Sequence, residues 1–144
     1  MQDESLVETW RRSVLEIKSF GKWITLWDGQ TYYPDAVPEE VRGQDLYVVT
    51  AYNPGSTPLS DRQNRERDER LFAHISSLNS AGSFVSVGRS LSGSHTEYGY
   101  AIYGISKSDA DNLATEFGQI GYYRLTSRDM EIFALGDSGE FSKV

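Results

Sequence analysis

One run of residues most constrains the fold of this chain. Residues 46–52, Leu46-Tyr47-Val48-Val49-Thr50-Ala51-Tyr52, are apolar, aromatic or β-branched without a charged interruption. Residues of these types favour β-strands. A strand with one face in water alternates apolar with polar side chains, whereas a strand covered on both faces reads as a continuous apolar run. The sequence therefore predicts a strand at 46–52 in the middle of a sheet.

The residues after this strand predict an alternation of helices and strands. Ser60 and Gln63 form a capping pair for a helix with a later apolar stripe at Leu71, Phe72, Ile75 and Leu78. We then expect strands at 83–91 and 97–105, a helix from Ser106 to Gly118, and strands at 121–126 and 130–135. The first six elements follow the order of a ferredoxin-like βαββαβ sandwich. We therefore predict an α+β fold of this type with an extra C-terminal strand.

A helix and a hairpin are expected before this core. Ser5-Leu6-Val7-Glu8 is a capping-box pattern, and Leu6, Trp10, Val14 and Ile17 then recur at helical spacing up to Gly21. A hairpin around Asp28-Gly29 would join strands at 22–27 and 31–33. Residues 34–45 are expected to be a mobile surface loop. We predict one domain over 1–144, with an extension at 1–45, a core at 46–135 and a flexible tail at 136–144.

Composition excludes several classes of site and partner. The 144 residues include no cysteine and two histidines, so disulfides, thiolate metal sites, a cysteine nucleophile and a His-rich metal site are excluded, and we expect no cofactor or metal. There are 14 basic and 21 acidic residues, and the net charge of −7 disfavours nucleic acid as a partner. The N-terminus is acidic and lacks the apolar core of a signal peptide, and no apolar run is long enough to span a membrane. We therefore expect a cytoplasmic protein without membrane contact.

The segment that joins the central strand to the next helix is the strongest candidate site. Asn53-Pro54-Gly55-Ser56-Thr57-Pro58 links a strand end to a helix N-terminus, a place where ligands often bind. Asn53 and Ser56 could add hydrogen bonds to a polar ligand. The alternative interpretation is a structural turn, because Asn accepts unusual backbone angles, Pro fixes φ and Ser60 caps the helix. The lysine and the glycine spacing of a P-loop are absent.

A carboxylate and an imidazole form a second candidate site. His95, in the Ser/Gly loop, and Glu97, at the start of the expected strand, are two residues apart. On a strand this spacing puts two side chains on the same side, where they could exchange protons. The alternative is a solvated loop histidine. Gln119, just after the last helix, would either meet Asn53 in one pocket or cap a sheet edge.

Two further patterns have simpler explanations. Arg62, Arg65, Arg67 and Arg70 suit phosphate recognition, but interleaved acids favour a solvated helix with ion pairs inside it. Tyr98 and Tyr100 share a strand face as in base-stacking platforms, but basic surroundings are missing and sheet tyrosines explain them.

The segment from Val49 to Ser60, with Asn64 and Arg67 after it, resembles a bacterial family catalogued as domain of unknown function 3293. The family pattern has an aromatic-Asn-Pro-x-Ser loop, then Leu-Ser, then an Asn one helical turn later. The resemblance continues at Glu97, Gly104, Ile105, Ser106, Ala110, Leu113, Phe117, Gly118 and Gln119, and it covers residues 46–135. The chain departs from the family at His95, where Trp is usual, and at Gly99, where Ser is usual. The resemblance implies no particular activity.

These observations leave three functional classes. We favour a binding or interaction module for a small polar ligand or a protein partner, because no catalytic constellation is complete. Its expected binding residues are Asn53, Ser56, Ser60, Asn64, Arg67, Glu97 and Gln119. The alternatives are an enzyme for a small polar or nucleotide-like substrate, with Glu97 as general acid or base, and an acidic inhibitor that blocks a basic site on a partner. A homodimer through exposed aromatic side chains stays open.

Overall fold

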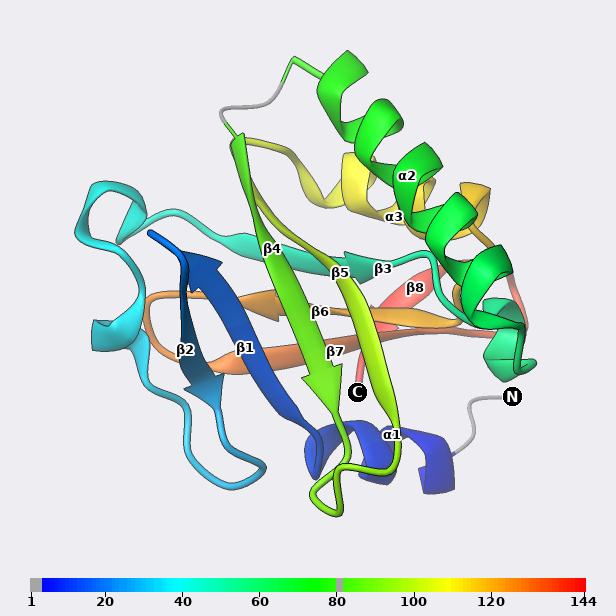
Figure 1. The fold of residues 1–144 in the computed structure, drawn as a ribbon, viewed down its shortest axis with the longest axis horizontal. Coiled ribbons are helices and arrows are strands. Elements are labelled where there is room, and N and C mark those ends of the chain that lie inside the picture. The colour runs from blue at the N-terminus through cyan, green and yellow to red at the C-terminus, as the bar shows by residue number, and fades with distance from the viewer. Residues whose placement is uncertain (1–3, 80–81) are drawn as a thin grey trace.

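A computed structural model describes residues 4–79 and 82–144, which form three α-helices and one eight-stranded antiparallel sheet (Figure 1). The elements are α1 (Glu4–Arg11), β1 (Val14–Ser19), β2 (Lys22–Trp27), β3 (Leu46–Thr50), α2 (Asp61–Ser77), β4 (Gly82–Arg89), β5 (Thr96–Tyr103), α3 (Lys107–Glu116), β6 (Gly121–Leu125), β7 (Met130–Leu135) and β8 (Phe141–Lys143). Short 3-10 turns lie at Pro34–Ala36, Glu39–Val41 and Pro54–Ser56. The strand order is β2-β1-β4-β5-β3-β6-β7-β8. The expected mixture of helices and an antiparallel sheet is confirmed.

The central position of β3 is also confirmed. It pairs with β5 on one side and with β6 on the other, so that Val48 lies opposite Ala101 and Tyr123. Tyr47 and Val49 pack in the core on one face, and Val48 packs in the core on the other. The run is continuously apolar because both faces of this strand are buried.

Helices α2 and α3 cover the same face of the sheet. Leu71 and Ile75 of α2 and Leu113 and Phe117 of α3 belong to one buried cluster with Val49. Both helices begin at the expected residues, because Ser60 with Gln63 and Ser106 with Asp109 form complete capping boxes. The expected left-handed residue after α3 is Gly118, with a φ of 66°.

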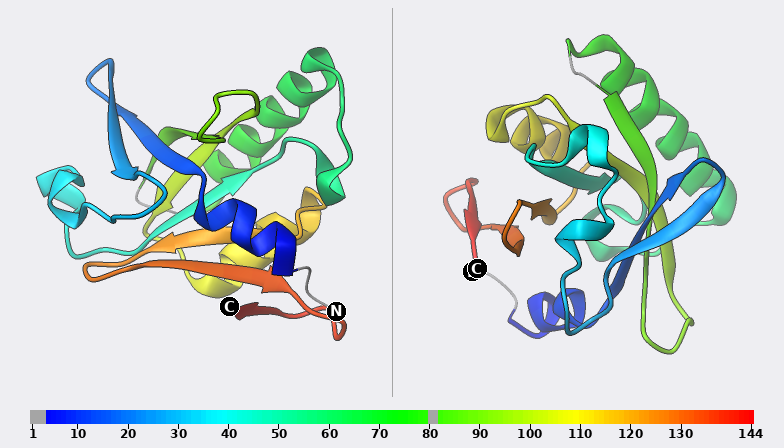
Figure 2. Two further views of the ribbon diagram at one scale, coloured as in Figure 1. Left: turned by 90° about the horizontal axis from the view of Figure 1, so that it is seen from below. Right: turned by 90° about the vertical axis from the view of Figure 1, so that its left-hand side faces the viewer.

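The opposite face packs against the N-terminal part of the chain. Leu15, Ile17 and Leu26 form its core together with Val37 and Val41. The segment at 34–45, expected to be a surface loop, is therefore anchored by two buried valines. Figure 2 shows that α1 lies on the far side of the molecule from α2. None of the helices in the described ranges is both long and apolar enough to span a membrane.

The first helix is shorter than its apolar spacing predicts. It ends at Arg11, and Val14 and Ile17 belong to β1, which pairs with both β2 and β4. Phe20 and Gly21 both have positive φ, and they form the hairpin turn between β1 and β2. The spacing fitted a helix, but pairing on both sides of β1 buries the same side chains in the sheet. The capping role expected of Ser5 concerns a side chain outside the described part of the structure.

Two other expectations about the extension and the tail were wrong. The Asp28 carboxylate accepts hydrogen bonds from the backbone of Gln30 and Thr31, and only one bridge, Trp27 to Tyr32, remains of the expected returning strand. Residues 136–144 are not simply frayed, because β8 pairs with β7 and buries Phe141. The tail is also held by the ion pair of Lys143 with Glu131 at 3.0 Å and by Val144, which packs against a buried cluster.

Candidate functional site

The end of β3 is held by a network of side-chain hydrogen bonds, which we call the β3-end network: Asn53, Asn64, Arg67, Glu97 and Gln119. Asn53 has a left-handed backbone, with a φ of 47°, which Asn tolerates better than most residues. Its backbone N–H donates to Asn64 Oδ1 at 2.9 Å, and Asn64 Nδ2 donates to Asn53 Oδ1 at 2.9 Å. The backbone N–H of Leu59 donates to the same Asn53 oxygen. These contacts join the loop at 53–59 to α2.

The free amide group of Asn53 reaches across to β5. Asn53 Nδ2 donates to Glu97 Oε2 at 3.0 Å, and His95 Nε2 lies 2.8 Å from the same oxygen. A carboxylate only accepts hydrogen bonds, so these partners fix which atom of the Asn53 amide is nitrogen. His95 lies in the loop just before β5 with its side chain 62% exposed, as the alternative of a loop histidine expected, and it contacts Glu97 from there.

The remaining two members of the network bind backbone carbonyls. Arg67 donates to the carbonyls of Ala51 and Phe117, and Gln119 Nε2 donates to those of Tyr52 at 3.0 Å and Phe117 at 3.2 Å. Burial lowers the pKa of Arg67, and no carboxylate balances its charge in the described residues. Both side chains tie the end of β3 to the C-terminus of α3.

A cavity of about 300 Å³, which we call the sheet cavity, lies beside this network. Its apolar walls come from four elements, with Trp10 from α1, Leu15 from β1, Val48 from β3 and Tyr123 from β6. The Tyr123 hydroxyl donates to the Trp10 carbonyl at 3.0 Å, so α1 is held to β6. The cavity thus lies on the face of the sheet opposite α2 and α3.

The polar lining of the sheet cavity contains groups without partners. Ser86 on β4 is 3% exposed as a residue, and its hydroxyl, which is not sealed from solvent, makes no hydrogen bond with any described residue. Glu97 Oε1 and Gln119 Oε1 also accept no hydrogen bond within residues 4–79 and 82–144. Arg89, also in the lining, is paired with Glu16 at 3.0 Å.

The described residues contain no group of three His, Asp or Glu side chains arranged to hold a metal ion.

The structure separates the seven expected binding residues into two groups. Asn53, Ser56, Glu97 and Gln119 line the sheet cavity. Asn64 and Arg67 lie outside its lining and support the loop, while Ser60 caps α2. Gln119 and Asn53 both line the sheet cavity, as the alternative of one shared pocket predicted. The Gln119 amide nevertheless donates to the Tyr52 carbonyl and not to Asn53.

Sequence reasoning missed Ser86 and Trp10. Ser86 lies opposite Gly99 of β5 and Ile17 of β1, and only that register reveals that it faces the cavity. Trp10 reaches the cavity because Gly121 has no side chain, since a Cβ there would overlap the indole. No local signal in the sequence marks either residue as part of a site.

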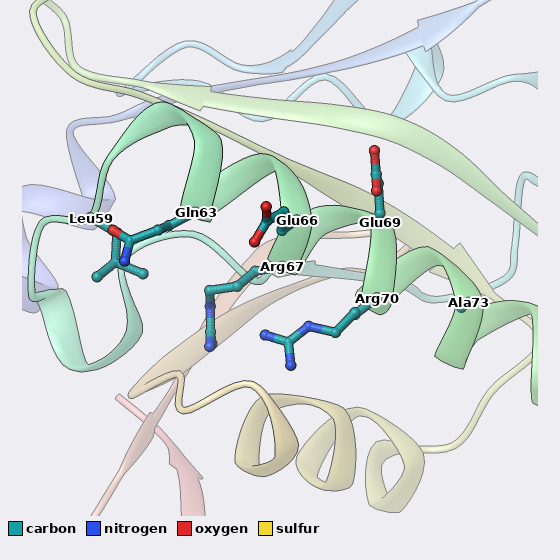
Figure 3. A pocket seen from close by; sticks show the side chains of 7 residues that line it. All are labelled: Leu59, Gln63, Glu66, Arg67, Glu69, Arg70 and Ala73. Carbon is teal, nitrogen blue, oxygen red and sulfur yellow. The ribbon is translucent and has the colours of Figure 1, made fainter.

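A second hollow runs along α2 and is more open (Figure 3). Arg67 and Arg70 point from α2 toward α3 there, whereas Glu69 points away from them. Arg67 is already bonded to two carbonyls, and Arg62 pairs with Glu66 at 3.3 Å as expected for ion pairs within the helix. The side chains of this hollow that bind within the protein are therefore occupied, and its walls lack the apolar side chains of the sheet cavity, so we do not regard it as the site.

The segment that carries the β3-end network matches a known protein family. A family model described as "Protein of unknown function (DUF3293)" matches residues 49–120, half of the chain. The chain belongs to this family. The matched segment includes every member of the β3-end network, so the family resemblance at those residues coincides with one connected structure. No curated protein and no solved structure matched the chain.

Proposed function

We propose that this protein is a binding module whose ligand occupies the sheet cavity. The observation that carries the proposal is the hydroxyl of Ser86, a residue that is 3% exposed and lines the cavity; this hydroxyl has no partner among the described residues. The hydroxyl is not sealed from solvent, because the one buried side-chain atom without a partner in the described residues is Asp68 Oδ1. A polar group of a ligand in the cavity could therefore replace water as its hydrogen-bond partner.

The lining of the cavity supports the proposal. Ligand pockets combine mostly apolar walls with a few convergent polar groups, and they typically measure about 300–1,000 Å³. The sheet cavity, at about 300 Å³, lies at the small end of that range. Trp10, Leu15 and Val48 supply apolar walls, and Ser86 and Glu97 supply polar groups. The ligand is therefore a small molecule, about the size of one or two rings.

The rigidity of the β3-end network also supports the proposal. Asn53 and Glu97 are held by Asn64 and by each other before any ligand arrives. Side chains fixed in this way lose little conformational entropy when they bind a ligand. Asn53 and Glu97 therefore form a preorganised part of the cavity wall, which Asn64 supports from outside the lining.

A fragment screen by ligand-observed NMR tests the proposal. We expect fragments that bind the wild type to lose binding in Ser86→Leu, which fills the cavity, and to keep it in Ser92→Leu. Ser92 is exposed in the β4–β5 loop, so it provides the same change outside the cavity. Thermal melts would check that both variants are folded. If no fragment distinguishes the two variants, the proposal is wrong.

One observation favours an enzyme as a second candidate. His95 Nε2 lies 2.8 Å from Glu97 Oε2 at the lining of the cavity, and such a pair can act as a general acid and base. Incubation with a metabolite extract, followed by mass spectrometry, would test it. Consumption of a compound by the wild type but not by Glu97→Gln would support catalysis, and equal consumption would exclude Glu97 from it. The acidic inhibitor stays an untested alternative.

We also propose that β3, α2, β4, β5, α3 and β6 form a ferredoxin-like unit. The strand order β4-β5-β3-β6, the antiparallel pairs and the placement of both helices on one face support this. An experimental structure would test it by the handedness of the two helical crossovers, which is right-handed in such units.

A further inference from the structure

We infer that the sheet cavity selects an organic cation, an amine or amidine carried on a small apolar body. The inference rests on the proposed binding function and concerns which ligand chemistry the lining accepts. It follows from the hydrogen-bonding capacity that remains free in the lining, from its charge and from its apolar walls.

Several hydrogen-bond donors in the lining already bind groups of the protein. Asn53 Nδ2 donates to Glu97, and Gln119 Nε2 donates to two backbone carbonyls. Arg89 donates to the Glu16 carboxylate through Nε at 3.0 Å. Turning either amide around would place its oxygen against an acceptor, so the orientations are set by the partners.

The lining also offers free hydrogen-bond acceptors. Glu97 Oε1 and Gln119 Oε1 accept no hydrogen bond within the described part of the chain, and the Ser86 hydroxyl can accept as well as donate. A ligand with several N–H groups would satisfy these atoms. An amidine or a primary ammonium carries such groups on one end.

The charges in the lining favour the same ligand. Within the described ranges Glu97 pairs with no lysine or arginine, and its one ionisable partner is His95, whose side chain is 62% exposed. The positive charge of Arg89 is balanced by Glu16. A cation beside Glu97 would form a charge-assisted hydrogen bond with a side chain that is three-quarters buried (25% exposed), whereas an anion would be repelled.

The apolar walls would hold the rest of the ligand. Trp10, Leu15 and Val48 line the cavity, and Gly88 leaves space in the wall because it has no side chain. A flat ring could pack against this surface while its charged end reaches Glu97. An aromatic amidine combines the two features in a molecule small enough for the cavity.

The test compares three probes of nearly equal shape: benzamidine, which is cationic, benzamide, which is neutral, and benzoate, which is anionic. Titration followed by protein-observed NMR should show benzamidine binding at least about tenfold more tightly than benzamide, because a charge-assisted bond replaces a neutral one. Benzoate should bind most weakly of the three. Shifts confined to the lining of the sheet cavity would place the probe there.

Two variants assign the preference to Glu97. Glu97→Gln keeps an oxygen that accepts from Asn53 but removes the charge, so we expect the preference for benzamidine to fall to about twofold or less. Glu116→Gln removes a charge from exposed α3 and should keep the full preference. If Glu97→Gln does not fold, the order of the three probes on the wild type still decides the inference.

The outcomes separate this inference from the proposal on which it rests. Benzamide or benzoate binding in the cavity as tightly as benzamidine would overturn the cation preference and leave the binding function intact. Ser86-dependent binding of neutral fragments without binding of benzamidine would do the same. If no probe and no fragment binds in the cavity, both the inference and the proposed function are wrong.

Discussion

Asn53 and Asn64 bind each other through two hydrogen bonds, although one lies in a loop and the other in a helix. Asn53 N donates to Asn64 Oδ1 and Asn64 Nδ2 donates to Asn53 Oδ1, both at 2.9 Å. These two hydrogen bonds lie just beyond Thr50, where β3 and its backbone hydrogen bonds end. They hold Asn53 in its left-handed conformation. From there Asn53 reaches Glu97 on the cavity lining. One buried amide on α2 therefore positions the loop that lines the sheet cavity.

Replacing Asn64 by alanine should destabilise the protein by about 1–3 kcal/mol, because the backbone N–H and the side chain of Asn53 both lose a buried partner. Urea denaturation would measure the free energy of unfolding. Asn112→Ala is the matched control: Asn112 is exposed on α3, and its loss should change stability by about 0.5 kcal/mol or less. Equal effects of the two changes would mean that the pairing with Asn53 contributes nothing.

Replacing Gly121 by alanine should destabilise the protein by about 1–3 kcal/mol and displace Trp10. A Cβ at this position would overlap the Trp10 indole and lie 2.6 Å from the Phe133 carbonyl oxygen. Gly88→Ala is the control on the same cavity, because its Cβ would meet Leu15 Cδ2 at an ordinary 3.5 Å. Urea denaturation with near-UV circular dichroism would report both effects. A Gly121→Ala variant with native stability and an unchanged tryptophan signal would contradict the packing.

Asp68→Asn should stabilise the protein at pH 7, by about 1 kcal/mol. Asp68 Oδ1 is buried without a partner, and burial raises the pKa of this carboxyl above its ordinary 3.8, against the opposing hydrogen bond from Tyr100. A raised folded-state pKa means that the stability contributed by the protonated group is complete below pH 3.8 and is lost as the pH rises through the folded value. The gain from asparagine should therefore vanish at low pH.

Urea denaturation at pH 7 and at pH 3.5 would measure this difference. Asp61→Asn provides a control with the opposite sign, because Asp61 is exposed in the first turn of α2, where a negative charge stabilises the helix by about 0.3–1 kcal/mol. A gain from Asp68→Asn that persists unchanged at pH 3.5 would show that ionisation is not its cause.

Glu131→Gln should destabilise the protein by about 1–3 kcal/mol at pH 7 and by less at pH 3. Arg124, at 2.6 Å from Glu131 Oε1, lowers the pKa of this buried carboxyl below its ordinary 4.5, and Lys143, at 3.0 Å from Oε2, adds to the effect while burial opposes it. A lowered folded-state pKa contributes stability that is present above pH 4.5 and lost as the pH falls through the folded value.

Chemical denaturation of Glu131→Gln and of Glu140→Gln across that pH range would check the assignment. Glu140 is exposed, so its replacement should change stability by about 0.5 kcal/mol or less at both pH values. If Glu131→Gln costs as much at pH 3 as at pH 7, the ion pairs with Arg124 and Lys143 are not the source of the loss.

Local sequence signals were sufficient to predict an element where that element alone carries the signal. The apolar run at 46–52 predicted a central strand. The pair Ser60 with Gln63 and the residue Ser106 predicted where two helices begin. The signals failed where a short apolar pattern fits two periods. Val14 and Ile17 continue a helical spacing, yet they lie in β1, because strand partners on both sides compete successfully with the helix.

The sequence by itself determined which segments become β3, α2 and α3. It also placed Asn53, Glu97 and Gln119 among the candidate site residues. Their connection was decided by the tertiary structure, because α2 and β5 cross the end of β3 and bring Asn64 and Glu97 to Asn53. The sheet cavity also exists only in three dimensions. Ser86 enters it through strand register, and Trp10 closes over it because Gly121 leaves room. Contacts between residues so far apart in the chain leave no periodic trace in the sequence.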